Sequence, residues 1–156
     1  MTPPGFYGRK ENNMIGVEPY ITFQGNCEEA LSFYKECLGG EILYIGRYGG
    51  SPMAGQAPDD KIMHATLKIG NTHIMAADNM SPDPFAVGGN ISLSVGTENA
   101  EDAERIFNAL SEGGRVTMPI AETFWAERFG MLTDKFGIDW MVNCEKAADG
   151  MEKTAA

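Results

Sequence analysis

The sequence predicts an α+β fold in which two βαβββ modules form one cupped mixed sheet. Each half of the chain contains one helical pattern that starts at an asparagine and stops at a pair of glycines, Gly39-Gly40 and Gly113-Gly114. The second copy lies about 73 residues after the first, as expected for an internal duplication. Each helical pattern is preceded by one strand pattern and followed by three, which gives the predicted module its order.

The first module begins with a strand pattern over residues 20–24, closed by Gly25. Asn26 is the expected N-cap of a helix, and Glu29 completes a capping box. The apolar residues that follow recur at helical spacing and predict one buried stripe: Cys27, Ala30, Leu31, Tyr34 and Leu38. Strands are expected over 41–48, 62–69 and 72–77, with a Gly/Pro-rich loop over 49–60 and a tight turn at Gly70-Asn71.

The second module repeats this order after a linker over residues 81–89. A strand is expected over 90–95, followed by a helix capped by Asn99 or Thr97. The apolar face of that helix comprises Ala100, Ala103, Ile106, Phe107 and Leu110. Strands follow over 115–121, 129–133 and 138–144, and the last two are joined by the turn from Asp134 to Gly137.

This order predicts one domain over residues 17–145, divided into modules at 17–80 and 88–145. Residues 1–16 are expected to form a loose extension and residues 146–156 a tail. One helix cannot cover both faces of a four-stranded sheet, so the other face of each module is expected to line a cleft between them. Clefts of this kind are the usual place for a small ligand.

The composition excludes several classes of partner. A net charge of −10 disfavours binding to nucleic acid. No apolar run is long enough to cross a bilayer. The chain has three cysteines, an odd number without a CxxC pair, which favours reduced thiols and a cytoplasmic protein. One of them, Cys27, lies in the first turn of a predicted helix, where the pKa of a thiol can fall, although core packing is an equally good explanation.

Several motifs resemble the PhnB-like branch of the vicinal oxygen chelate (glyoxalase/bleomycin resistance/dioxygenase) superfamily. They are Pro19-Tyr-Ile-Thr-Phe-Gln-Gly-Asn26, Glu122-Thr-Phe-Trp-Ala126 and Thr133-Asp-Lys-Phe-Gly137 with Trp140. The resemblance covers roughly residues 17–145, and it is most specific between Glu122 and Trp140. It implies the glyoxalase-like fold and a homodimer.

The resemblance also implies where metal-dependent members hold their ion. Their four ligands lie on the first, fourth, fifth and eighth strands, at positions that correspond here to Pro19, Met75, Asn90 and Met141. Proline offers no side-chain donor, and a thioether suits Cu(I) better than hard or borderline ions. We therefore expect no metal at these positions and no cofactor. A phosphonate ligand, which the PhnB link suggests, would need arginines such as Arg47, Arg115 or Arg128.

Three residues are candidates for catalysis. His64 and Asp78 are expected nearly opposite each other across the hairpin, where a carboxylate could orient the imidazole for acid–base chemistry. A structural hydrogen bond at the hairpin end is the alternative. Glu122 precedes Phe124 and Trp125, whose rings could desolvate its carboxyl group and raise its pKa. Alternatively, Glu122 is a turn residue that accepts backbone hydrogen bonds.

Six further residues are expected to contact a ligand. They occupy polar or aromatic positions on predicted inner strands or in the aromatic loop: Tyr20, Asn90, Ser92, Trp125, Phe129 and Asn143. An exposed strand face or a dimer contact would also account for such residues. For Trp140, packing in the core beneath a helix is the favoured role.

These observations predict a small-molecule-binding protein, either a sequestering protein or a metal-independent enzyme with His64 or Glu122 as base. One alternative is a metal-dependent lyase or dioxygenase that takes its ligands from His64, Asp78 and Glu122. Another is an interaction domain whose cleft is filled by side chains. The sequence leaves open whether the protein is an enzyme.

Overall fold

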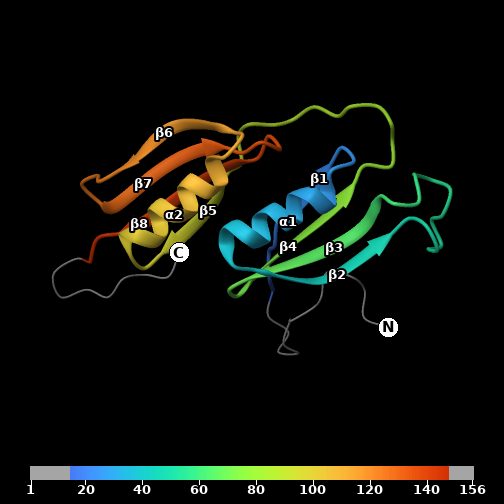
Figure 1. The fold of residues 1–156 in the computed structure, drawn as a ribbon, viewed down its shortest axis with the longest axis horizontal. Coiled ribbons are helices and arrows are strands. Elements are labelled where there is room, and N and C mark those ends of the chain that lie inside the picture. The colour runs from blue at the N-terminus through green and yellow to red at the C-terminus, as the bar shows by residue number, and fades with distance from the viewer. Residues whose placement is uncertain (1–14, 148–156) are drawn as a thin grey trace. The chain divides into compact units, whose positions relative to one another are not determined.

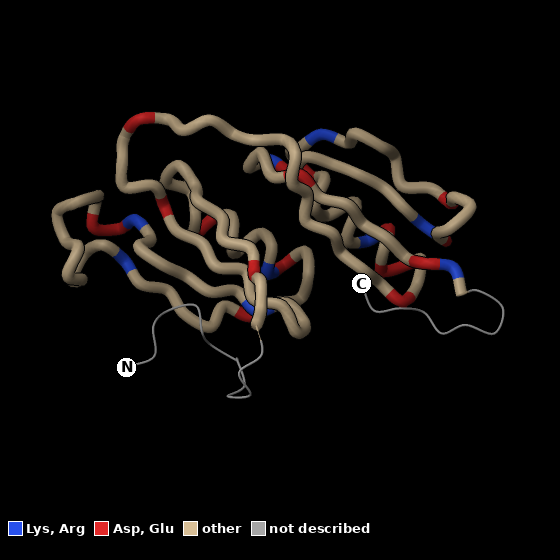
Figure 2. The backbone as a smooth tube through the Cα atoms, turned by 180° about the vertical axis from the view of Figure 1, so that it is seen from behind, with Lys and Arg blue, Asp and Glu red and all other residues tan. Residues whose placement is uncertain are grey.

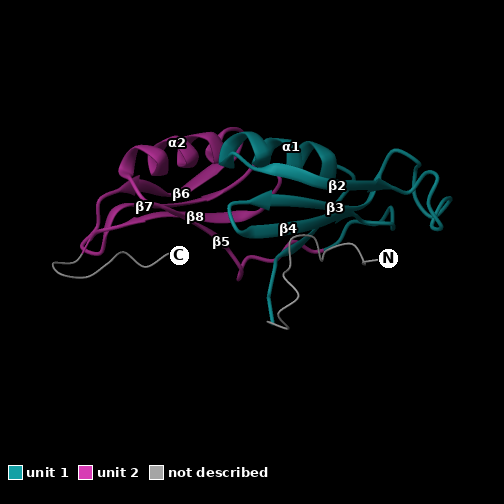
Figure 3. Cartoon of the chain, turned by 90° about the horizontal axis from the view of Figure 1, so that it is seen from below, with its two compact units in different colours: residues 1–85 teal, residues 86–156 magenta. Residues whose placement is uncertain are grey.

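The computed structural model describes residues 15–147. The extension expected over 1–16 and the tail expected over 146–156 therefore lie almost wholly outside the described residues. The chain divides between Phe85 and Ala86 into two compact units (Figure 3). This boundary falls within the linker that the sequence predicts over residues 81–89.

Unit 1 has the predicted βαβββ order (Figure 1). Its elements are β1 (Tyr20–Phe23), α1 (Cys27–Leu38), β2 (Glu41–Arg47), β3 (Ile62–Ile69) and β4 (Thr72–Asp78). The strands form one sheet in the order β1-β4-β3-β2. β1 is parallel to β4, and the other two pairs are antiparallel. The sheet is therefore mixed, as expected.

Unit 2 repeats this arrangement. Its elements are β5 (Leu93–Thr97), α2 (Ala100–Ser111), β6 (Arg115–Ala121), β7 (Ala126–Thr133) and β8 (Asp139–Glu145). The sheet order is β5-β8-β7-β6, with β5 parallel to β8. The predicted α+β class and the duplication of the module are confirmed.

Each helix packs on one face of the sheet in its own unit (Figure 3). In unit 1 this face is apolar because alternate strand residues point toward α1. Its buried strand residues are Phe23, Ala65, Leu67, Ile74 and Ala76. In unit 2, α2 approaches β7 so closely that a Cβ at Gly130 would lie 2.6 Å from the Phe107 ring. We call the opposite face of each sheet its helix-free face.

The two helices are capped differently. In α2, Asn99 Oδ1 accepts a hydrogen bond of 2.7 Å from the Asp102 amide, so the predicted cap is confirmed. In α1, Asn26 makes no side-chain cap hydrogen bond, so the predicted capping box is wrong. The amide of Cys27 instead donates to Asp78 Oδ1 at 2.9 Å. The buried carboxylate of a distant strand takes the place of the local cap.

The fifth strand begins later than expected. β5 starts at Leu93, which pairs with Trp140, and β8 itself starts only one residue earlier, at Asp139. Residues 90–92 therefore have no strand partner on β8, and Asn90 and Ser92 precede the strand. Within the described residues, neither helix is long and apolar enough to cross a membrane.

Candidate functional site

The helix-free face of unit 1 brings three rings together around His64. Strand pairing aligns Tyr20 with Met75, Met75 with Thr66, and Thr66 with Tyr44 in one row across the sheet. The next row contains His64, which pairs with Gly46 on β2. Cross-strand partners share a face, so Tyr20, Tyr44 and His64 lie on the same side of the sheet, opposite α1.

Both nitrogens of the His64 ring lie at hydrogen-bond distance from hydroxyl groups. Tyr20 Oη is 3.2 Å from Nδ1, and Thr66 Oγ1 is 3.4 Å from Nε2. The ring centroid lies 5.6 Å from that of Tyr20 and 6.1 Å from that of Tyr44, both tilted. The imidazole is 8% exposed whereas Tyr20 is 50% exposed, so solvent reaches this cluster on the Tyr20 side.

Burial sets the protonation states of this cluster. It lowers the pKa of His64 below its ordinary value of 6.5, because the charged imidazolium loses hydration. Burial also raises the pKa of Tyr20, and Cys27 and Tyr48 add smaller contributions. At neutral pH the imidazole is therefore neutral and the phenol protonated. A neutral imidazole beside a hydroxyl can accept a proton or a hydrogen bond from a ligand.

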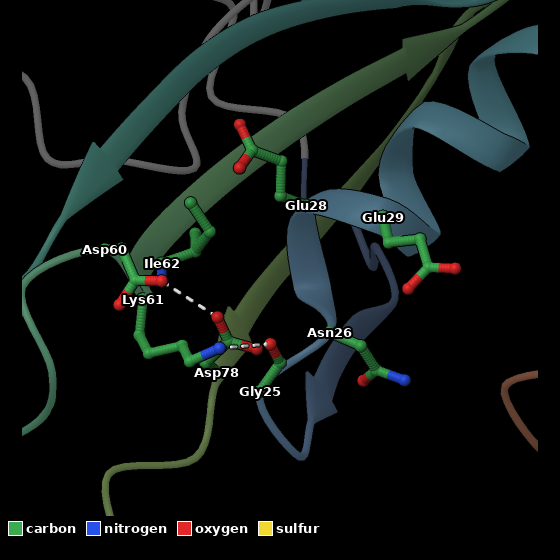
Figure 4. Close-up of a pocket in the computed structure, with 8 residues that line it drawn as sticks. All are labelled: Gly25, Asn26, Glu28, Glu29, Asp60, Lys61, Ile62 and Asp78. Carbon is green, nitrogen blue, oxygen red and sulfur yellow. Dashed lines mark hydrogen bonds between the residues drawn. The ribbon is translucent and has the colours of Figure 1, made fainter.

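Asp78 does not orient His64, so the expected pair is wrong. Ala65 pairs with Ala76, which places Asp78 on the face that packs against α1 and His64 on the opposite face. Asp78 is 3% exposed, and its Oδ2 accepts a 2.8 Å hydrogen bond from the Ile62 amide. Figure 4 shows this carboxylate at the start of β3, beside the N-terminus of α1. Its role there is structural.

A shallow pocket surrounds this position, but the His64 cluster is not part of it. Its volume is about 210 Å³, and its walls include Glu28, Glu29 and Asp60 (Figure 4). Lys61 Nζ crosses it and donates to the carbonyl of Gly25 at 2.9 Å. The pocket thus lies on the acidic surface at the start of α1.

Glu122 is not desolvated, which contradicts the expected effect of the neighbouring rings. Its side chain is 67% exposed, and Oε1 lies 3.6 Å from Lys146 Nζ. Phe124 is itself 89% exposed, so it shields little. The Phe124 and Trp125 rings contact each other edge to face at 4.8 Å.

Three of the expected ligand-contacting residues gather on unit 2. Phe129 pairs with Asn143 on the helix-free face, and the Trp125 ring lies 5.4 Å from the Phe129 ring. Within the described residues, Asn143 Oδ1 is buried and has no hydrogen-bond partner. Asn90 and Ser92 precede β5 and do not belong to this paired row.

The structure does not fit the metal site that the fold family implies. Tyr20, and not Pro19, shares a row with Met75, while Ser94 pairs with Met141 in unit 2. These positions offer a phenol and a thioether in unit 1 and a hydroxyl and a thioether in unit 2, and such groups are poor ligands for hard or borderline divalent ions. Among residues 15–147, no group of three or more His, Cys, Asp or Glu side chains converges to hold an ion.

Packing also bears on the predictions made for Cys27 and Trp140. Burial, with smaller contributions from Asp78 and Glu28, raises the pKa of the Cys27 thiol to about 12. The thiol is therefore protonated at neutral pH, which favours core packing as its role. Trp140 is buried, and its indole donates to Asp134 Oδ2 at 2.8 Å. Its predicted place in the core is confirmed.

Tyr20 and His64 were predicted from the sequence as site residues, whereas Tyr44 and Thr66 were not. Thr66 could have been found, because it lies two residues after His64 on the same predicted strand. Tyr44 could not, because the pairing of β2 with β3 shifts between Ile42 and Tyr44. That irregularity decides which residues of β2 face His64.

Known proteins resemble this chain along most of its length. Residues 17–142 match the family described as "Glyoxalase/Bleomycin resistance protein/Dioxygenase superfamily". Protein YjdN of Escherichia coli is 36% identical over 141 residues, which cover 83% of this chain and 95% of that protein.

Two solved structures share both sequence and fold with it. Protein PA1353 from Pseudomonas aeruginosa is 47% identical with a TM-score of 0.78, and the match covers 85% of this chain and 98% of that chain. A putative 3-demethylubiquinone-9 3-methyltransferase, PhnB protein, from Bacillus cereus is 27% identical with a TM-score of 0.74, over 83% of this chain and 99% of that chain. The resemblance to PhnB-like proteins is thereby confirmed.

Proposed function

This chain belongs to the glyoxalase/bleomycin resistance/dioxygenase superfamily, and from that membership we propose that it binds a small, partly apolar molecule. The binding surface is the helix-free face of unit 1 beside His64. We propose further that no metal ion takes part, because the groups beside the His64 imidazole are hydroxyls and a thioether, whereas sites for divalent ions of this kind combine several imidazole or carboxylate ligands.

The observation that carries this proposal is the ring cluster itself. A neutral imidazole, two tyrosines and a threonine hydroxyl lie on one sheet face, where packing alone would favour aliphatic side chains. The Tyr20 hydroxyl fixes the imidazole at 3.2 Å while its ring remains half exposed. Apolar rings that present a few fixed polar atoms are typical of small-molecule sites.

The test is to map binding on the ¹⁵N-labelled full-length chain by NMR. Benzaldehyde, acetophenone and phenylphosphonate are titrated separately, each up to about 10 mM, the affinity range expected of ligands this small. We expect saturable shifts at Tyr20, His64 and Thr66 for at least one compound. Tyr20→Phe keeps the ring and removes only the hydroxyl, and it should weaken binding severalfold.

Arg105→Ala is the matched control, since Arg105 lies on the exposed side of α2 and pairs there with Asp102. It should bind each compound as the wild type does. The proposal fails if none of the three compounds shifts the His64 cluster, or if the saturable shifts map to the helices.

A further inference from the structure

We propose that the face beside His64 selects uncharged ligands, namely an aromatic ring carrying a carbonyl or hydroxyl group, and discriminates against anions such as phosphonates. This inference rests on the proposed function, because it names the class of ligand for the same site. The observation that supports this inference is the distribution of charged side chains on this face.

The two rows that surround His64 contain no ionised side chain at neutral pH. One row is Tyr20, Met75, Thr66 and Tyr44. The other contains the pairs Thr22–Ala77 and His64–Gly46. Figure 2 shows acidic and basic positions only near the ends of the unit 1 strands. A ligand that contacts the exposed Tyr20 end of these rows therefore meets a hydroxyl group, rings and a thioether, but no fixed charge.

Charged residues of the same face begin one row further along, and there acidic residues lie on both sides of Lys68. Lys68 pairs with Glu41 on one side and with His73 on the other. Glu18 Oε2 in turn lies 3.7 Å from His73 Nδ1. A phosphonate near Lys68 would therefore approach two carboxylates as well. Its repulsion by those carboxylates offsets its attraction to the lysine.

Two of the three arginines that could hold a phosphonate, Arg47 and Arg128, are engaged on the helix side. Arg47 binds Glu28 of α1 through both terminal nitrogens, at 3.2 and 2.7 Å. Arg128 Nε donates to Glu104 of α2 at 2.7 Å. A phosphonate would have to replace these bidentate or short charge-assisted bonds. Arg115 lies in unit 2, at the first position of β6, and is not part of the His64 cluster.

An anion would be stabilised by a charged His64, but burial opposes that state. The lowered pKa of His64 means that protonation at neutral pH costs free energy, which an anionic ligand would have to supply in addition to its own desolvation. A carbonyl or hydroxyl group requires neither protonation of His64 nor desolvation of a charge, because a neutral imidazole and a phenol can form hydrogen bonds with it.

Gly46 provides a variant that alters the ring cluster while the His64 and Tyr20 side chains themselves stay unchanged in sequence. A Cβ at this position would lie 2.5 Å from Tyr44 Oη and 3.0 Å from Tyr44 Cζ. The Gly46→Ala change must therefore push the Tyr44 ring away from its present place. Gly89→Ala is the matched control, because a Cβ at Gly89 meets no atom within 4 Å.

The experiment compares acetophenone with phenylphosphonate, which carry the same ring, in NMR titrations of the full-length chain at pH 7.5. We expect acetophenone to bind at the His64 cluster about tenfold or more tightly, the factor that corresponds to a modest cost of burying an unpaired anion. Gly46→Ala should weaken acetophenone binding severalfold, and Gly89→Ala should leave it unchanged.

The inference is overturned if phenylphosphonate binds the cluster as tightly as acetophenone or more tightly, a result under which the proposed binding site still stands. It is also overturned if Gly46→Ala and Gly89→Ala bind acetophenone equally well. Absence of shifts at the cluster with either compound would remove the inference and the binding site together.

Discussion

At the scale of the residue, the neutral state of His64 links its environment to the pH dependence of stability. Burial lowers its pKa in the folded chain relative to the unfolded chain. Its contribution to stability is therefore fully present above the unfolded value of about 6.5 and is lost as the pH falls through the folded value. Ligand binding that requires the neutral imidazole weakens over the same pH range.

The sequence was sufficient to select individual residues but not their partners. Tyr20 and His64 could be chosen because each combines a polar group with a strand position. Their contact could not be predicted, because the two residues are 44 positions apart in the sequence and meet only through the parallel pairing of β1 with β4. Asp78 was assigned to the wrong face because the hairpin register differs by one residue from the one expected, and one residue changes the face.

At the scale of the element, Asp78 joins four segments of unit 1. Its two carboxylate oxygens accept from the amides of Cys27, at the start of α1, and Ile62, at the start of β3. Its own carbonyl accepts from the Tyr48 hydroxyl at 3.2 Å, just after β2. The buried carboxylate thus accepts hydrogen bonds from the first backbone amide of α1 and the first of β3. It replaces the helix N-cap that the local sequence does not provide.

We expect Asp78→Asn to destabilise the chain by about 2–4 kcal/mol, measured by urea unfolding. The amide has one acceptor oxygen, so one buried backbone N–H loses its partner and faces an NH₂ group instead. Asp83→Asn, in the exposed linker, is the control and should stay within about 0.5 kcal/mol of the wild type. Equal unfolding free energies for the two variants would refute the joining role of Asp78.

The order of elements was predictable because it is encoded locally. Two glycine pairs stop the helices, and both Gly39 and Gly113 adopt a positive φ of 73°, which favours glycine. The cap of α1 was not predictable, because the Asp78 acceptor lies 51 residues from the Cys27 donor. The cap of α2 is local, at Asn99, and the sequence alone was sufficient to find it.

At the scale of the whole molecule, the duplication gives each unit its own helix, sheet and core. Each four-stranded sheet is covered by one helix on one face only. Of the candidate residues, Tyr20 and His64 in unit 1 and Phe129 and Asn143 in unit 2 lie on the other face. The cleft predicted between the modules stays a prediction. Family membership accounts for the fold, whereas the chemistry follows from the particular residues on the helix-free faces.

We also propose that the chain forms a homodimer, as the family resemblance implies. Phe124 is 89% exposed and contacts Trp125 edge to face, and exposed aromatic pairs are common anchors of interfaces. Light scattering at micromolar concentration should give twice the chain mass. Phe124→Ser should weaken association about tenfold or more, as expected for the loss of an aromatic anchor.

Val87→Ser is the control for that change, since Val87 is also exposed but lies in the linker. It should leave the mass unchanged. A monomeric wild type, or equal effects of the two substitutions, would contradict a dimer built on the aromatic loop.

NMR of the imidazole ring decides whether a neutral, buried His64 forms part of a ligand site. The chain has two histidines, so His73→Asn assigns the His64 ring signals unambiguously. We predict that His64 titrates below 6.5 and that acetophenone shifts its ring nitrogens in a saturable manner. A His64 that titrates at or above 6.5, with ring signals that do not respond to acetophenone, would contradict this account.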